Sequence, residues 1–306
     1  MIFSGLSPLL RLPAVSGLTR EALLKMDPEI AHGATIAALR LGLAPEQEGT
    51  DPPELRTTLC GLDLRNPVGM AAGFDKNAEV PKPLARMGFG MVEVGTVTPR
   101  PQQGNPKPRL FRVTAAEGVI NRMGFNNEGH EAAFARLKGA HVGAILGVNI
   151  GANKDSEDFV ADYVKGVTRF AEVADYLTVN ISSPNTPGLR NLQADEALER
   201  LLAAVLKARS KASVRVPVLL KIAPDLDEKA LDGIAKVVLA TDLDGLIVSN
   251  TTVSRDPVLG MENATETGGL SGKPLFNLAT QKLAQVRQRV GNLPIIGVGG
   301  IHSPES

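Results

Sequence analysis

Residues 216–250 read VPVLLKIAPDLDEKALDGIAKVVLATDLDGLIVSN and contain two short apolar runs separated by a helical pattern. The runs are 218–222 and 245–249, and residues 228–239 between them carry apolar side chains at helical spacing. Apolar runs without polar alternation are typical of strands that are covered on both faces. A strand, a helix and a second strand in this order indicate a parallel βαβ unit, so the stretch predicts an α/β protein.

The same rhythm extends over most of the chain. Five more apolar runs lie at 67–72, 89–95, 144–150, 176–181 and 294–298, and a second clear helical pattern covers 197–208. Polar side chains follow nearly every predicted strand: Lys76, Thr96, Asn149, Asn180, Lys221 and Ser249. These strand ends would meet at one mouth in a barrel but would spread along a line in an open doubly wound sheet. Because no strand is followed by a G-x-G-x-x-G turn, the pattern favours a TIM (β/α)8 barrel.

The first fifty residues form a segment of their own. We expect a short helix from Thr19 to Met26 and a second helix that begins at Asp27-Pro28, where Asp is a good N-cap and Pro suits the first helical position. The segment is either a cap packed on the core or an amphipathic platform that lies on a membrane or admits an apolar substrate. The predicted domains are therefore 1–50, helical, and 51–306, the barrel, which starts with a hairpin turning at Gly61.

Composition excludes several classes of protein. The 306 residues include 33 basic and 33 acidic side chains, and this balance argues against a nucleic-acid-binding protein. The single cysteine, Cys60, excludes a disulfide framework, and four isolated histidines give no metal-ligand spacing. The longest stretch without charged residues, 139–153, is too short to span a bilayer.

Several loops carry residues that suit a binding site. The stretches 121–127 and 180–188 are rich in asparagine, and prolines 184 and 187 stiffen the second of them. Asparagine matches a neutral heterocycle that has both C=O and N–H edges. Lys76 and Lys221 suit an anion or a developing negative charge. Since these loops contain neither a metal cluster nor an obvious carboxylate base, redox chemistry through a bound cofactor is favoured.

Two other interpretations remain at this point. The first is a lyase or aldolase on the same barrel that uses Lys76 or Lys221 as a Schiff base. The second is a non-catalytic module on a membrane surface, which leaves the convergent asparagines and lysines without a role.

Seven segments together resemble the membrane-associated class 2 (quinone-dependent) dihydroorotate dehydrogenases of the bacterial type: 26–29, 73–76, 106–112, 121–126, 180–188, 249–251 and 268–275. The resemblance implies an FMN-containing barrel that oxidises (S)-dihydroorotate to orotate in de novo pyrimidine (UMP) synthesis and passes the electrons to a membrane quinone. It also implies a monomer whose N-terminal helices contact the cytoplasmic face of the cell (inner) membrane peripherally.

The resemblance assigns roles to individual positions. Ser183 matches the catalytic base, where the soluble class 1 relatives use a cysteine. Positions that match substrate contacts are Lys76, Asn121, Arg122, Met123, Gly124, Phe125, Asn180, Asn185, Asn250 and Thr251. Positions that match cofactor contacts are Ala72, Gly73, Lys76, Thr96, Asn149, Asn180, Lys221, Ser249, Gly272 and Gly300. His32 and Arg112 match positions near the quinone tunnel, and no metal is implied.

The family pattern continues past the seventh strand with another βα unit that contributes to the flavin phosphate site. This chain ends at Ser306, shortly after the predicted strand 294–298. We therefore expect a barrel that lacks its eighth unit, and we expect a chain of these 306 residues to bind FMN weakly.

Overall fold

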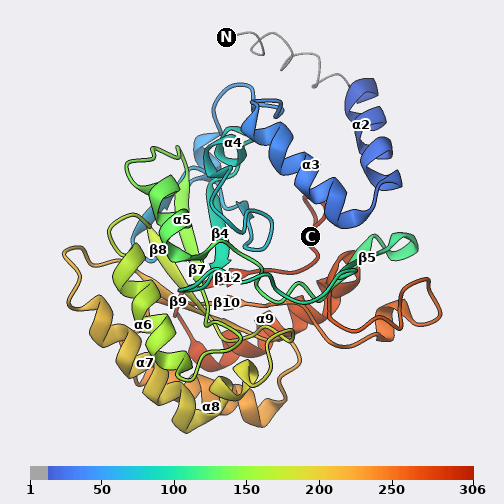
Figure 1. Ribbon diagram of the computed structural model, residues 1–306. Coiled ribbons are helices and arrows are strands. Elements are labelled where there is room, and N and C mark those ends of the chain that lie inside the picture. The colour runs from blue at the N-terminus through green and yellow to red at the C-terminus, as the bar shows by residue number, and fades with distance from the viewer. Residues whose placement is uncertain (1–12) are drawn as a thin grey trace.

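A computed structural model describes residues 13–306 of the chain (Figure 1). Its main sheet has seven parallel strands in the order β12-β10-β9-β8-β7-β4-β3. The strands are β3 (Gly69–Met70), β4 (Met91–Val97), β7 (Ile145–Ile150), β8 (Tyr176–Asn180), β9 (Val218–Ile222), β10 (Gly245–Val248) and β12 (Ile295–Gly297). Each of the seven predicted runs overlaps one of these strands, and only β4 extends beyond its run, to Val97. The predicted parallel βα architecture is therefore confirmed.

Helices cover the outer face of this curved sheet. Figure 1 shows α5 to α9 as an outer row around the strands. The helices are α4 (Pro81–Arg86), α5 (Gly129–Leu137), α6 (Phe159–Phe170), α7 (Asp195–Arg209), α8 (Glu228–Leu239) and α9 (Phe276–Val290). Helix α8 has the predicted bounds and is capped by Asp227, whose side chain accepts from Ala230 N at 2.8 Å.

Alternation along the strands separates the hydrophobic core from the barrel interior. On β8, Leu177 and Val179 belong to the main core that includes the helices, whereas Tyr176 belongs to a smaller interior cluster. Thr178 and Asn180 follow Tyr176 at period two and are therefore directed inward as well. The interior face of this strand is thus polar towards its C-terminal end, where a site would be built.

Two smaller antiparallel sheets complete the strands. The hairpin of β1 (Thr57–Leu59) and β2 (Leu62–Leu64) was predicted and is confirmed. A three-stranded arm of β5 (Leu110–Val113), β6 (Gly118–Asn121) and β11 (Gly269–Gly272) was not predicted. Because Asn121 pairs with Gly269, the arm brings the 121–127 loop beside the loops that follow β10. Short 3₁₀ turns lie at η1 (Pro53–Leu55), η2 (Thr114–Ala116), η3 (Leu189–Gln193), η4 (Asp256–Val258) and η5 (Lys273–Leu275).

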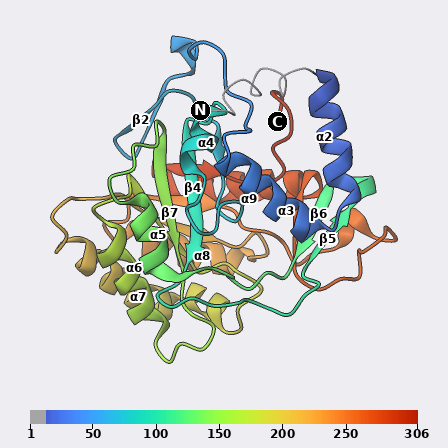
Figure 2. The same cartoon turned by 45° about the horizontal axis from the view of Figure 1, so that its top comes forward.

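The N-terminal segment forms two helices, α2 (Pro13–Lys25) and α3 (Pro28–Arg40). Asp27 caps α3 as predicted, since its Oδ1 accepts from Glu29 N at 2.9 Å and Ile30 N at 3.0 Å. Helix α2 extends further than predicted, because Pro13 already belongs to it, and residues 1–12 of the predicted segment lie outside the described part. Figure 2 shows both helices on the side of the molecule that carries β5, β6 and the C-terminus.

Helix α3 packs on the barrel. Ile36 and Leu39 are buried in the main hydrophobic core. Within residues 13–306, no helix combines the length and the apolar character that crossing a membrane requires.

Candidate active site

A cavity of about 810 Å³ extends from the barrel interior to the C-terminal ends of the parallel strands. Its size falls within the range of ~300–1,000 Å³ that is typical of ligand pockets. The cavity brings together all but three of the site residues predicted from sequence. These are His32, Ala72, Gly73, Lys76, Thr96, Asn121, Met123, Gly124, Phe125, Asn180, Ser183, Asn185, Lys221, Ser249, Asn250, Thr251, Gly272 and Gly300.

The other three predicted residues are not among those that line the cavity. Asn149 is fully buried, and its Oδ1 accepts from the Thr96 hydroxyl at 2.6 Å. Arg122 forms an ion pair with Glu266 at 2.5 Å. Arg112 donates to three backbone carbonyls at the C-terminal end of α2 and in the turn that follows.

Ser183 is held in the stiff loop that follows β8. Its side chain is buried, and its Oγ accepts from the backbone N–H of Asn185 at 3.2 Å. The end of the strand is fixed by Tyr163, whose hydroxyl donates to Asn180 O at 2.6 Å. Thr186 Oγ1, in the same loop, is buried and has no hydrogen-bond partner among the described residues. The loop therefore holds a buried hydroxyl at the cavity with a second, unpaired hydroxyl three residues away.

The asparagines around Ser183 are oriented by contacts with one another and with the backbone. Asn185 Nδ2 donates to Asn121 O at 3.2 Å, which joins the β8 loop to the arm. Asn250 Nδ2 donates to the Ser182 hydroxyl at 2.9 Å, and its Oδ1 accepts from Thr251 N at 2.7 Å. These amides therefore have fixed donor and acceptor sides.

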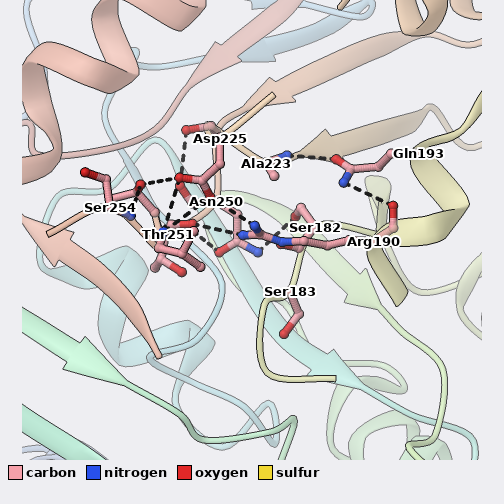
Figure 3. Close-up of polar contacts among 12 residues, drawn as sticks. Ser182, Ser183, Arg190, Gln193, Ala223, Asp225, Asn250, Thr251 and Ser254 are labelled. Carbon is pink, nitrogen blue, oxygen red and sulfur yellow. Dashed lines mark hydrogen bonds and ion pairs between the residues drawn. The ribbon is translucent and has the colours of Figure 1, made fainter. Parts of the chain in front are cut away.

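One arginine braces the loops that follow β8, β9 and β10 (Figure 3). Arg190 donates to Ser182 O at 3.0 Å and to the Asp225 carboxylate at 3.0 Å. It also lies 3.5 Å from Thr251 O. Asp225 in turn accepts from the Thr252 hydroxyl. Figure 3 shows the Ser183 side chain pointing away from this network.

Lys76 and His32 lie where α3 meets the cavity. The Lys76 amine donates to Gly73 O, and burial, together with the charge of Arg109, lowers its pKa to about 8. His32 Nε2 lies 2.7 Å from Phe74 O, and the two rings meet edge to face with centroids 5.4 Å apart. Burial, and then the charge of Lys76, lower the pKa of His32. This part of the site therefore favours the neutral form of the His32 imidazole, next to the Lys76 amine, which can bind an anion.

Comparisons with known proteins agree with this geometry. A family profile described as dihydroorotate dehydrogenase matches residues 54–306. The chain belongs to the dihydroorotate dehydrogenase family. A relative from Rhizobium johnstonii named dihydroorotate dehydrogenase (quinone) is 60% identical over 294 residues, which are 94% of this chain and 81% of the relative. A protein of the same name from Agrobacterium fabrum is 60% identical over 296 residues, 95% of this chain and 82% of that protein.

Solved structures of the family have the same fold. The dihydroorotate dehydrogenase of Eimeria tenella in complex with ferulenol superposes with a TM-score of 0.88 at 40% identity, covering 94% of this chain and 84% of that one. The ligand-free form from the same organism gives a TM-score of 0.87 at 42% identity, covering 90% and 84%. These likenesses confirm the predicted TIM-type α/β fold with an N-terminal helical region.

The cavity of this family member also contains charged and aromatic residues that the sequence did not reveal as site residues. Glu93 on β4 and Tyr176 on β8 both line it, next to Lys221. Burial lowers the pKa of Lys221, while the charge of Glu93 opposes this shift. The sequence did contain one signal for them. The apolar run 89–95 contains a single acidic residue, and the run 218–222 contains a single lysine. Because charged side chains are rarely buried unless they are paired with an opposite charge, the two residues are candidates for such a pair.

One part of the lining consists of backbone and suits a phosphate group. Gly272, Gly299 and Gly300 line the cavity without side chains. A Cβ at Gly300 would lie 2.6 Å from Phe276 N, so this segment approaches the first residue of α9 closely. Backbone N–H groups beside a helix N-terminus favour an anion. Together with the Lys221 amine elsewhere in the cavity, this donor set fits a flavin mononucleotide.

Proposed function

We propose that the chain oxidises dihydroorotate to orotate in pyrimidine synthesis, with FMN as its bound cofactor and a membrane quinone as the final electron acceptor. The observation that carries the proposal is the convergence on one cavity of a buried serine, oriented amides and a lysine, in a member of the dihydroorotate dehydrogenase family. The proposed substrate contacts are Lys76, Asn121, Arg122, Met123, Gly124, Phe125, Asn180, Asn185, Asn250 and Thr251. Their amides match the alternating C=O and N–H edges of the pyrimidine ring, and Lys76 supplies a charge for its carboxylate.

Flavin dependence is general in the family. The residues proposed to hold FMN are Ala72, Gly73, Lys76, Thr96, Asn149, Asn180, Lys221, Ser249, Gly272 and Gly300. When bound, FMN supplies the acceptor for the hydride that leaves C6 of the substrate and then delivers two electrons to the quinone. The Lys221 amine stabilises negative charge in the cavity, since it is buried and forms no ion pair within the described residues.

Ser183 is the proposed base that removes the proton from C5 of the substrate. An alcohol is a weak base in water, so the reaction needs a site from which water is excluded and an acceptor for the serine's own proton. Ser183 is 4% exposed, which meets the first need. The unpaired hydroxyl of Thr186, or a water molecule, meets the second.

The N-terminal segment, residues 1–50, is proposed to contact the membrane and to admit the quinone to the barrel, residues 51–306. Ile30 on α3 is 62% exposed and Leu41 is 58% exposed, so this segment presents apolar side chains to the surroundings. His32 on α3 lines the cavity, and Arg112 donates to Leu23 O near the end of α2. A net charge of zero fits a contact that is mainly apolar. We propose peripheral attachment at the cytoplasmic face of the inner membrane and a monomeric protein.

The test is anaerobic mixing of the flavin-loaded protein with dihydroorotate, followed by addition of quinone. Bleaching of the flavin absorbance and its return with quinone, but not with NAD or fumarate, are expected. Ser183→Ala should retain flavin and lose the fast bleaching, whereas Ser210→Ala, an exposed serine at the end of α7, should behave as the unaltered protein. A colourless protein that borohydride traps with a carbonyl substrate would instead support Schiff-base chemistry.

A further inference from the structure

Glu93 is a buried carboxylate in the barrel interior that the proposed reaction does not use. It is 4% exposed and lies on β4. Its Oε1 accepts from Asn149 Nδ2 at 2.7 Å, and its Oε2 accepts from the Tyr176 and Thr178 hydroxyls, both at 3.0 Å. Three donors from two neighbouring strands therefore converge on one acceptor.

The carboxylate fixes the orientation of the next two amides. A carboxylate only accepts hydrogen bonds, so Asn149 must turn its Nδ2 towards Glu93 and its Oδ1 the other way. That Oδ1 accepts from the Thr96 hydroxyl at 2.6 Å and from Asn180 Nδ2 at 3.2 Å. Asn180 Nδ2 also donates to Thr96 Oγ1 at 3.0 Å. Asn180 therefore turns its amide nitrogen towards Asn149 and Thr96 and its amide oxygen away from them.

The same direction continues into the loops at the cavity. Asn180 Oδ1 accepts from the Ser182 hydroxyl at 2.7 Å. Because that hydroxyl has one proton and has donated it, its oxygen is left as an acceptor, and Asn250 Nδ2 donates to it at 2.9 Å. Asn250 Oδ1 then faces Thr251 N at 2.7 Å (Figure 3). The chain of hydrogen bonds runs in one direction from the barrel interior to the proposed substrate contacts.

We propose that Glu93 is a positioning residue whose carboxylate sets the direction of this chain and thereby determines which amide atoms the protein presents to the substrate. The inference rests on the proposed function, because it concerns the same ligand site. With the chain in this direction, Asn250 has a second amide hydrogen for the cavity that it lines. In the reverse direction Asn250 would turn its carbonyl oxygen to that place, where an acceptor on the ligand would meet another acceptor. It would also turn its Nδ2 towards Thr251 N, where two donors would meet.

Glu93→Gln tests the proposal because it keeps the shape of the side chain but makes it both a donor and an acceptor. The side chain at position 93 then no longer imposes the direction, which only the backbone N–H donors of Ser182 and Thr251 still favour. We expect orotate affinity to fall by about tenfold. Orotate affinity is measured at equilibrium, from the shift in the flavin absorbance, and KM and kcat for dihydroorotate are measured separately. Thr178→Val is the matched control: it removes one donor from the same carboxylate without changing the direction, and should leave orotate affinity within about twofold.

Ser182→Ala tests the same chain at its middle and does not depend on the folding of the Glu93 variant. Ser182 does not line the cavity, so a loss of orotate affinity in this variant reports transmission through its hydroxyl. If the chain transmits the effect, Glu93→Gln adds little to Ser182→Ala in a double-mutant cycle. Unchanged orotate binding in either variant, additive effects, or a change confined to the flavin reduction potential would overturn the proposal. Failure of the unaltered protein to bind orotate or to be reduced by dihydroorotate would count against the proposed function instead.

Discussion

The brace formed by Arg190 gives a prediction whose size follows from the structure. Arg190→Leu removes the donors to Ser182 O and to Asp225 but leaves Asp225 with its contacts to the Thr252 hydroxyl and the Val253 amide. The substitution therefore does not strand a buried charge. It separates the loop that carries the proposed base from the loops that follow β9 and β10.

The lost stabilisation is moderate. A hydrogen bond from a charged donor contributes ~1.5 kcal/mol at the lower end of its range. The ion pair is partly screened, because its side chains are 25% and 18% exposed, and contributes about 1 kcal/mol. The contact with Thr251 O adds little at 3.5 Å. A total of about 2–3 kcal/mol corresponds to a decrease in Tm of about 3–5 °C for a domain of roughly 300 residues, whose unfolding entropy is ~0.6 kcal/mol/K.

The assay compares stability with catalysis. Arg190→Leu is expected to lower kcat/KM for dihydroorotate by about tenfold or more, because misplaced loops lose orientation of the substrate. Arg289→Leu is the control, since Arg289 forms ion pairs with Asp232 and Glu228 between the outer helices α8 and α9. It should lower Tm with unchanged kinetics. Arg190→Leu could instead lower Tm and leave KM and kcat as in the unaltered protein. That result would refute the prediction, because it would show that the loops keep their positions without Arg190.

Three further predictions concern charge and packing. Lys76 has a pKa of about 8, so orotate affinity should fall as the pH rises above that value, whereas Lys76→Met should give a weak affinity without this pH dependence. Burial opposes ionisation of Glu29, but the hydrogen bonds and charges of Arg109 and Lys107 outweigh it and lower its pKa below 4.5. Its contribution to stability is therefore complete above pH 4.5 and lost as the pH falls through the lowered pKa, so the Tm difference between the protein and Glu29→Gln should vanish in acid. A Cβ at Gly147 would lie 2.2 Å from the buried Tyr176 ring, and Gly147→Ala should cost ~1–3 kcal/mol in thermal or urea unfolding, whereas an unchanged midpoint would contradict this packing.

The strands and most of the site could be predicted because their signals are local. A strand buried on both faces appears as one apolar run, and the polar residue that ends it lies next to it in the sequence. Asn180 and Lys221 illustrate this, since each ends or nearly ends a run and both line the cavity. The Asp27 cap was predictable for the same reason.

The features that escaped prediction depend on distant parts of the chain. β11 is a glycine-rich stretch with no strand pattern, and it becomes a strand only because β6, far away in the sequence, pairs with it. Glu93 interrupts an apolar run, but its hydrogen-bond partners lie on β7 and β8, so the sequence does not identify them. Arg112 was placed near the quinone tunnel by its match to the family pattern, and only the structure shows its guanidinium on the carbonyls of Leu23 and Leu24 at the end of α2.

The arm ties the helical pair to the wall of the cavity. Leu110 on β5 lines the cavity, and the arginines on either side of it, Arg109 and Arg112, hold opposite sides of the α2–α3 turn. Arg109 binds Glu29 at the start of α3 at 2.7 Å, and Arg112 donates to Met26 O after α2 at 2.7 Å. A displacement of the turn therefore acts on the strand that forms part of the cavity wall.

The two attachments differ in strength, and this difference indicates which helix would yield to an entering quinone. Arg109 has a side chain only 7% exposed and also donates to Gln103 O at 2.6 Å and Asn105 O at 2.9 Å, so releasing α3 would leave a buried guanidinium with unpaired donors. Arg112 lies nearer the surface and binds only neutral carbonyls, for which water can substitute. If the quinone enters between the two helices, as proposed above, movement of α2 costs less than movement of α3, and α3 keeps His32 in place at the cavity.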